Sequence, residues 1–375
     1  MKLAAVVVHY RTPALAARCV EALRADAVGS ALELDIVLVD NGSDAADRPG
    51  LAALPVRLVE PGANLGYAGG VNRGIAAATE AAAMSIALHD CYVVLNPDVL
   101  VEPGCLAALG DALAKGAGIA GPRLLWDVTS GDLLPPLEPS TRRWELLRRL
   151  AERRGGRWAR RARRVWRRHA LAQWRASEPV SSFALSGALL AFNAAAWRRV
   201  GPFDEGYRLY FEETDWLARA RRAGVGARHV PAARAVHLYA QSTPHEPRAA
   251  AWLAASQQRY RRRHHGRAFD ALVTFIDRGD PAPHGAEREA ARFEPSPANE
   301  TWPADSSVRW IETSPSPLGV PAAGRPIPTG LRGDEPLVPP TLEPRLAAGT
   351  WWLRAVDEAG RTRHRRRVER SKVPE

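Results

Sequence analysis

Short apolar runs rich in valine and leucine recur four times in the first 95 residues, separated by stretches of helical character. The runs cover residues 3–9, 34–39, 54–59 and 91–95. Runs of this length with little polar interruption are typical of strands buried on both faces of a parallel sheet. Thr12 and Pro13 suit the start of a helix that reaches about Leu23. The alternation of strands and helices predicts an α/β sheet.

Polar clusters follow three of these four strands directly. They are Asp40-Asn41-Gly42-Ser43, the glycine-rich stretch from Asn64 to Gly74, and Asn96-Pro97-Asp98. One polar turn after a strand is ordinary, but ligands of α/β sheets bind outside the carboxyl ends of the strands, so three clusters at one edge indicate a site. The glycine-rich stretch is neither a P-loop nor a dinucleotide fingerprint. The helix that it opens can accept a phosphate at its N-terminus.

A second concentration of polar groups lies in residues 186–216. Glu212, Glu213 and Asp215 open a predicted helix over residues 212–222. Acids in a first helical turn are common, because the helix dipole favours negative charge there. The apolar residues just before them would also hold the carboxylates at the wall of a pocket, where a carboxylate can act as a general base. The residues alone leave both interpretations open.

The net charge of +11 comes from one segment. Residues 142–175 hold 14 arginines against Glu145 and Glu152, a local charge of +12, which leaves about −1 for the rest. A helical stripe of Trp158, Ala162, Val165 and Trp166 runs through this segment. A solvated covering helix, a nucleic-acid site and an interfacial helix on an anionic leaflet are the three interpretations, and the sequence favours the last.

The predicted organisation is a large α/β domain over residues 1–279, with the basic helical insert at about 142–175. A linker rich in proline and alanine follows at 280–303, and a small β-rich, sandwich-like module with a basic tail covers 304–375. The three cysteines have neither metal-site nor disulfide-framework spacing, which fits a reducing compartment. Without a signal-type start or a run long enough to span a bilayer, the expectation is a cytoplasmic or peripheral protein.

Seven motifs in order resemble the family-2 glycosyltransferases, in the branch typified by bacterial rhamnosyltransferases. They are VVVHYRTP, VLVDNGSD, NLGYAGGVNRGI, VVLNPDV, GPRLL, SGALLAFNAAAWRRVGPFDEGYRLYFEETDW and RHVPAARAVHLYAQST, and the resemblance covers about residues 2–263. It implies a GT-A fold, with a Rossmann-like nucleotide-binding sheet and an acceptor-binding half. It also implies an inverting transfer from a nucleotide-sugar donor, assisted by Mg²⁺ or Mn²⁺.

The resemblance also assigns residues to roles. For the donor it implies a nucleobase pocket at Asp40 and Asn41, lined by His9, Tyr10 and Arg11, and a sugar-diphosphate loop that contains Asn64, Gly66, Tyr67, Gly69, Asn72 and Arg73. Asn96, Pro97, Ser186 and Gly187 complete the predicted substrate-binding set, while Asp98 and His237 match the metal ligands. Glu213 matches the catalytic base, with Asp215 and Glu212 as alternatives. The chain departs from the family pattern at Arg11, at Asn96 and at Glu213, where asparagine, aspartate and aspartate are usual.

The function expected from these observations is the inverting transfer of a sugar such as rhamnose from a dTDP-, UDP- or GDP-linked donor. The acceptor would be a glycan or a lipid-linked molecule at the inner leaflet of the plasma membrane, and no nucleic-acid partner is expected. The alternative is a non-catalytic, glycosyltransferase-like protein that binds an anionic polymer or a membrane through its arginine-rich insert.

Overall fold

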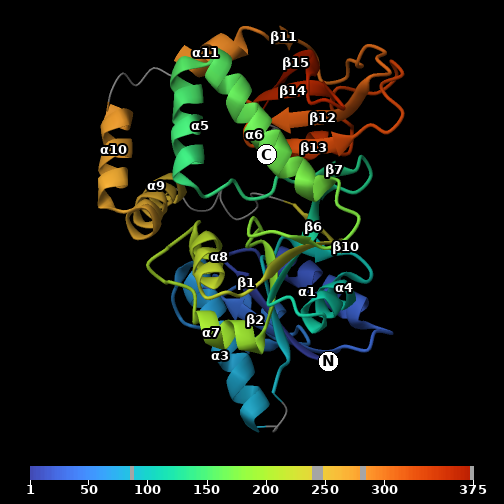
Figure 1. Cartoon of the computed structure of the whole chain (residues 1–375). Helices are drawn as coiled ribbons and strands as arrows, with labels where there is room; N and C mark the ends of the chain where they lie inside the picture. The colour runs from blue at the N-terminus through green and yellow to red at the C-terminus, as the bar shows by residue number, and fades with distance from the viewer. Residues whose placement is uncertain (85–87, 239–247, 279–283, 372–375) are drawn as a thin grey trace. The chain divides into compact units, whose positions relative to one another are not determined.

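The computed structural model of the chain describes residues 1–84, 88–238, 248–278 and 284–371 (Figure 1). Contacts divide the chain into two compact units. The first unit comprises Met1–Leu124 and Ala176–Asp270, and the second comprises Leu125–Arg175 and Ala271–Glu375. This division differs from the predicted one, because the basic insert falls in the same unit as the C-terminal residues.

The sheet of the first unit is parallel in its N-terminal half, as the apolar runs predict. Its order is β3-β2-β1-β4, continued by the antiparallel strands β9 and β6. The bounds are β1 Lys2–His9, β2 Glu33–Asp40, β3 Arg57–Val59, β4 Cys91–Leu95, β9 Leu189–Asn193 and β6 Ile119–Asp127. Off this path, β10 Ala227–His237 pairs with β6 and, antiparallel, with β5 Val99–Val101 and β8 Val180–Ser181. The predicted α/β class is thereby confirmed.

Alternate residues of β1 face different helices. Leu3, Ala5 and Val7 join the core cluster that holds the buried residues of α1 Pro13–Ala27 and α4 Cys105–Ala114. Val6 and Val8 face α3 Gly66–Met84, where a Cβ on Gly74 or Gly70 would lie 2.3 or 2.6 Å from a valine methyl. Glycine at these positions therefore lets α3 approach the sheet closely enough to hold its N-terminus beside the strand ends.

The other helices of the first unit lie in the connections between strands or after the last strand, β10. They are α2 Arg48–Ala52, α7 Ala194–Val200, α8 Glu212–Arg222, α9 Ala249–Tyr260, the π-helix η2 Arg261–His265 and the start of α10 Arg267–Arg278. The apolar run at residues 189–200 forms a strand and then a helix, since β9 passes directly into α7. Asn193 makes this change possible, because its side-chain oxygen accepts a hydrogen bond from the Ala196 N–H (2.8 Å) and caps the helix.

The second unit contains one sheet and the two helices of the insert. The strand order is β11-β15-β14-β12-β13-β7. The bounds are β7 Asp132–Leu133, β11 Glu294–Pro295, β12 Val308–Ser314, β13 Ala323–Pro326, β14 Gly349–Asp357 and β15 Thr362–Arg370, with a short 3₁₀ turn η3 at Glu343–Arg345. The described C-terminal residues thus form a single sheet where a sandwich-like module is predicted. Of the predicted linker, residues 280–283 lie outside the described residues, and the remainder includes α11 His284–Ala290 and β11.

The insert forms the two helices α5 Arg142–Arg154 and α6 Gly156–Trp174, which confirms its helical character. Figure 1 shows α6 running alongside β12 and β13. Trp174 stacks on Trp310 of β12 with ring centroids 5.6 Å apart. Two buried ion pairs join α6 to C-terminal residues: Arg163 Nη1 lies 2.9 Å from a Glu289 oxygen, and Arg167 Nε lies 2.5 Å from Glu312. These contacts are why the insert belongs to the second unit.

The predicted apolar stripe of the insert does not form one exposed face. Ala162 and Trp166 are buried in the core of the second unit, whereas Val165 is 38% exposed. Trp158 packs against the edge of the same core and is only partly buried. The prediction of a four-residue membrane-facing stripe is therefore wrong, because Trp166 and Ala162 are packed into the core of the second unit. No helix within the described ranges is both long and apolar enough to cross a membrane.

Candidate active site

His9 and Asp40 lie side by side at the carboxyl ends of β1 and β2. The His9 Nε2 atom lies 3.5 Å from an Asp40 oxygen, and that oxygen accepts hydrogen bonds from the N–H groups of Gly42 (3.2 Å) and Ser43 (2.8 Å). Burial lowers the pKa of His9, and the Asp40 charge only partly opposes this, so the imidazole is neutral near pH 7.

The next two predicted residues lie nearer the surface. Arg11 has a left-handed backbone (φ 55°), and its guanidinium lies 5.2 Å from the centre of the Tyr10 ring. Its Nη2 atom is 3.7 Å from Asp44. The half-buried Tyr10 and the exposed Arg11 thus form an edge beside the buried His9 and Asp40, an arrangement suited to a flat heterocycle with polar edges.

Asn41 fastens the glycine-rich loop to the end of β2. Its amide nitrogen donates to the Gly66 carbonyl (3.0 Å), and its oxygen accepts from the Leu65 N–H (2.9 Å). Asn64 closes the same turn, because its side-chain oxygen accepts from the Gly66 N–H (2.8 Å). Gly66 has a φ of +77°, and a Cβ there would lie 2.6 Å from the Arg208 carbonyl oxygen, so this position requires glycine.

The remaining predicted residues of this loop contact protein or solvent. Asn72 holds the backbone of Phe203 through two hydrogen bonds of 2.9 and 3.0 Å and also donates to Glu205 (2.8 Å). Gly69 is close-packed against Leu65, and Arg73 is exposed. Asn72 is therefore placed to fix the loop that precedes α8, and a direct contact of Arg73 with substrate stays a prediction.

Tyr67 is the point where the separate parts of the site meet. Its hydroxyl donates to the Gly187 carbonyl (2.9 Å), and a Cβ on Gly187 would lie 3.0 Å from the Glu213 side chain. Burial raises the pKa of Tyr67 well above its usual value, and the negative charges of Glu212, Glu213 and Asp98 raise it further. Residues predicted from motifs far apart in sequence thus lie around a single phenol.

Glu212 and Glu213 begin α8 after a strained turn. The two preceding residues, Tyr210 and Phe211, both have positive φ angles (66° and 71°), which non-glycine residues adopt only when their surroundings enforce them. Burial raises the pKa of Glu213, although backbone hydrogen bonds at Glu213, Thr214 and Gly187 counteract it. Burial and the Glu213 charge raise the pKa of Glu212. Such a pair is suited to taking up a proton.

Asp215 has a different environment, because both of its oxygens accept hydrogen bonds from basic side chains. Its Oδ1 accepts from His264 Nε2 (2.7 Å) and its Oδ2 accepts from Arg219 Nε (2.8 Å). Burial alone would raise the pKa of Asp215, but the hydrogen bonds from His264 and Arg219 hold it below the usual value. With both oxygens engaged, Asp215 is better suited to position α8 than to accept a substrate proton.

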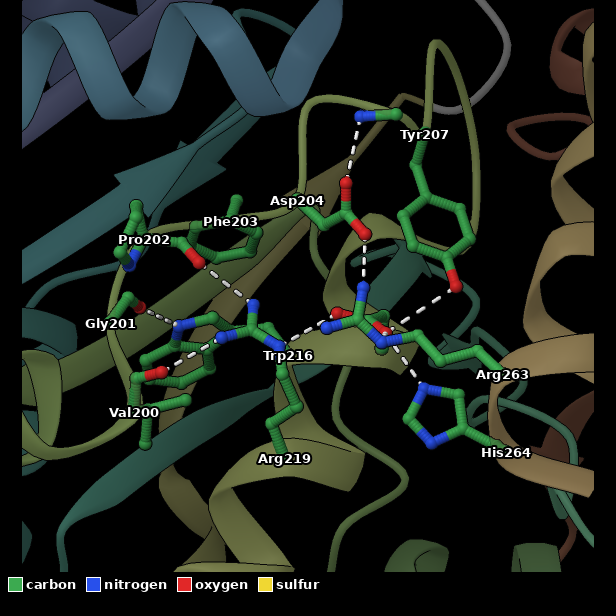
Figure 2. A network of polar contacts seen from close by, with 12 residues as sticks. Val200, Gly201, Pro202, Phe203, Asp204, Tyr207, Trp216, Arg219, Arg263 and His264 are labelled. Atoms are coloured by element: carbon green, nitrogen blue, oxygen red, sulfur yellow. Dashed lines mark hydrogen bonds and ion pairs between the residues drawn. The ribbon is translucent and has the colours of Figure 1, made fainter.

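The same network holds the loop before α8. Arg219 donates to the carbonyls of Val200 and Pro202 (2.8 Å each), and Trp216 Nε1 donates to the Gly201 carbonyl (2.8 Å) (Figure 2). Asp204, further along the loop, accepts from Arg259 (2.9 Å) and contacts Arg263.

Sequence reasoning missed Asp204, Arg259, Arg263 and His264. One signal in the sequence could have indicated them. The basic run of residues 261–265 directly follows a predicted helix, and the acids at 212–215 are the opposite charges with which such a run can pair.

Asp98 and His237 lie together beside β5 and β10. His237 Nε2 is 3.3 Å from an Asp98 oxygen, and Asp98 is 4% exposed. Strand pairing fixes this contact, since His237 pairs with Val99 and the Leu238 N–H donates to the Asp98 carbonyl (2.9 Å). The described residues contain no group of three or more His, Cys, Asp or Glu side chains that could hold a metal. A hard divalent cation that completes its shell with phosphate oxygens and water fits these two donors.

The other predicted residues around Asp98 shape the turn. The Asn96 N–H donates to the Ala188 carbonyl (3.0 Å), and the Ser186 hydroxyl accepts from the Ala188 N–H (3.2 Å). Pro97 is buried. These bonds tie the end of β4 to the start of β9 and keep Gly187 beside Tyr67.

An α/β sheet with polar clusters at its strand ends and a glutamate pair at the start of α8 is typical of glycosyltransferases of the GT-A fold. The chain belongs to the glycosyl transferase family 2, whose family model matches residues 4–159. It is 36% identical over 223 residues to N-acetylglucosaminyl-diphospho-decaprenol L-rhamnosyltransferase of Mycobacterium tuberculosis, in strains CDC 1551/Oshkosh and ATCC 25618/H37Rv. The match covers 57% of this chain and 69% of that protein, so the predicted rhamnosyltransferase-like branch is confirmed.

Among solved structures, a mannosyltransferase from Pyrobaculum calidifontis in complex with GDP-mannose and Mn²⁺ is similar. It is 16% identical with a TM-score of 0.43, over 77% of this chain and 74% of that chain.

Proposed function

We propose that the protein transfers a deoxysugar such as rhamnose, with inversion, from a nucleotide-sugar donor to a hydroxyl of a lipid-linked glycan. The arrangement around Tyr67 carries this proposal, because it gathers Glu212, Glu213 and Asp98 beside the phosphate-accepting loop. The relative's name supports the rhamnosyl donor and the lipid diphosphate acceptor. Such an acceptor would bring the enzyme to the inner face of the plasma membrane.

In the proposed reaction, the Glu213 carboxylate takes the proton of the acceptor hydroxyl. The acceptor oxygen then bonds to the anomeric carbon as the bond from that carbon to the diphosphate breaks, and a nucleoside diphosphate departs. Asp40 and the neutral His9 would hold the nucleobase, and the α3 N-terminus would face the phosphates. The lack of a side chain at Gly187 lets the Glu213 side chain pack closely against the backbone there.

A divalent cation bound by Asp98 and His237 would offset the negative charge of the departing diphosphate. We therefore expect the Asp98→Ala variant to lose the Mn²⁺-dependent part of the thermal shift produced by the donor, along with most of its transfer activity. A panel of UDP-, GDP- and dTDP-sugars with and without Mn²⁺ measures this shift, since a bound ligand raises apparent stability. An Asp98→Ala variant with an unchanged metal-dependent shift would refute this metal site.

The raised pKa values of Glu212 and Glu213 predict a pH dependence. A base must be ionised to act, so kcat/KM should rise with pH through a pKa above the ordinary glutamate value of about 4.3. Stability should change in the opposite sense: the folded state favours the protonated carboxyls, so their contribution is lost as pH rises through the raised pKa. A pH–rate profile with its acid limb at or below the ordinary value would contradict the assignment.

A further inference from the structure

The outer face of α6 is a ridge of arginines between two hollows. The first hollow has a volume of about 930 Å³ and the second of about 510 Å³. Arg160, Arg164 and Arg168 line both, spaced one helical turn apart. Arg157 and Arg161 extend the first hollow, and we call these five residues the arginine ridge.

The arginines of α6 divide into two sets by their partners. Arg163 and Arg167 point inward, are more than nine-tenths buried, and pair with Glu289 and Glu312. The five residues of the arginine ridge are exposed and have no acidic partner within the described ranges. The fold therefore neutralises the inner arginines and leaves the outer ones to attract an anion from outside.

Apolar side chains lie within the first hollow next to this charge. Trp158 and the exposed Val165 line it, and the Arg157 guanidinium lies 5.0 Å from the centre of the Trp158 ring. A tryptophan beside arginines suits the depth of lipid headgroups, where the ring meets the acyl boundary and the guanidinium groups meet phosphates.

We propose that the arginine ridge binds the headgroup phosphates of an anionic phospholipid bilayer, with phosphates in the hollows on both sides of α6 and Trp158 at the interface. The inference rests on the proposed lipid-linked acceptor, which requires the enzyme at a bilayer surface. The arginine ridge takes the place of the predicted stripe of Trp158, Ala162, Val165 and Trp166 as the membrane-facing surface. Trp166 and Ala162 are buried, whereas the arginines of the ridge are exposed.

Nucleic acid is the less favoured anion for this surface. Proteins that bind single strands combine positive charge with successive aromatic platforms for the bases. Trp158 is the only Trp, Tyr or Phe among the residues that line the two hollows. A ridge with one aromatic anchor fits a lipid surface better than a strand of stacked bases.

The test is co-sedimentation of the full chain with vesicles of phosphatidylglycerol and phosphatidylcholine, compared with vesicles of phosphatidylcholine alone. We expect binding only to the anionic vesicles, weakening with salt. The Arg160→Gln/Arg164→Gln variant should bind about 30-fold more weakly, because each arginine near an anionic surface contributes about a fivefold factor. The Arg160→Lys/Arg164→Lys variant should retain binding, and Arg18→Gln/Arg228→Gln, two exposed arginines of the first unit, is the matched control.

The Gln and Lys variants should unfold at the same temperature as the parent, since the replaced side chains have no ion pairs. Equal binding to neutral vesicles, or equal loss in the control variant, would overturn the proposal, as would binding of an RNA oligonucleotide in preference to anionic vesicles. Transfer to a water-soluble, short-chain acceptor separates this proposal from the proposed function. The Gln variant should keep that activity, whereas its absence from the parent would count against the enzyme assignment.

Discussion

Replacing Glu213 by glutamine should lower kcat for sugar transfer by about 10²- to 10⁴-fold, the usual contribution of a general base. Glutamine keeps the size of the side chain and its place beside Gly187 but cannot take up the acceptor proton. Other residues would hold the donor, so the thermal shift that the donor produces in the variant should stay close to the shift in the parent protein. Turnover by mass spectrometry and donor binding by thermal shift measure the two effects separately.

Two further variants make this test decisive. Glu80→Gln, on the exposed side of α3, is the matched control and should retain normal turnover. Glu212→Gln distinguishes the roles of the two neighbouring glutamates. Near-normal turnover of Glu213→Gln would refute its role as the base, and a large loss confined to Glu212→Gln would transfer that role to its neighbour.

Replacing Glu312 by glutamine should destabilise the protein by about 3–5 kcal/mol, the cost of leaving a buried charge without its partner. The Glu312 oxygens lie 2.5 and 2.8 Å from the Arg167 Nε and Nη2 atoms, and the side chain is almost fully buried. Burial alone would raise the pKa of Glu312, but the charges of Arg167 and Arg354 hold it below the usual value. The variant would leave both arginines uncompensated.

Urea unfolding followed by tryptophan fluorescence measures this loss, since the core of the second unit holds several tryptophans. Glu358→Gln is the matched control: its ion pair with Arg175 is 2.8 Å long but largely exposed, so the change should stay within about 1 kcal/mol. Equal, small effects of both substitutions would show that the buried pair does not hold the insert to the C-terminal sheet.

The sequence predicts those parts of the fold that depend on local pattern. Residues 91–95 and 212–222 were predicted with the bounds that β4 and α8 have in the structure, because apolar runs and an acid-rich helix start are local signals. The strand-end clusters predict the site in the same way, since parallel strands bring their ends to one edge.

The grouping of the chain into units has no such local signal. Arg163 and Glu289 are 126 residues apart, and Arg167 and Glu312 are 145 apart. An arginine in a basic helix has the same local pattern whether it faces solvent or a distant glutamate. Periodicity likewise shows that Trp158 and Trp166 share a helical stripe, but it cannot show that the core of the second unit buries Trp166 fully and Trp158 only in part.

The site also depends on contacts that a motif does not reveal. The pattern of acids before Trp216 leaves Glu212, Glu213 and Asp215 as alternatives for the base. One difference between them comes from His264, 49 residues beyond Asp215, which contacts the Asp215 carboxylate and lowers its pKa, whereas burial raises the pKa of Glu212 and Glu213.

The most direct measurement of the central claim is product formation. The full chain is incubated with Mn²⁺ and an N-acetylglucosaminyl-diphosphoryl lipid, and UDP-, GDP- and dTDP-sugars are added in separate reactions. The mass of the acceptor is then measured by mass spectrometry. We expect a single donor, dTDP-rhamnose, to add one deoxyhexose to the acceptor. The Glu213→Gln variant should abolish this addition. No added sugar with any donor, under conditions where the chain is folded and the nucleotide-sugar is bound, would contradict the account.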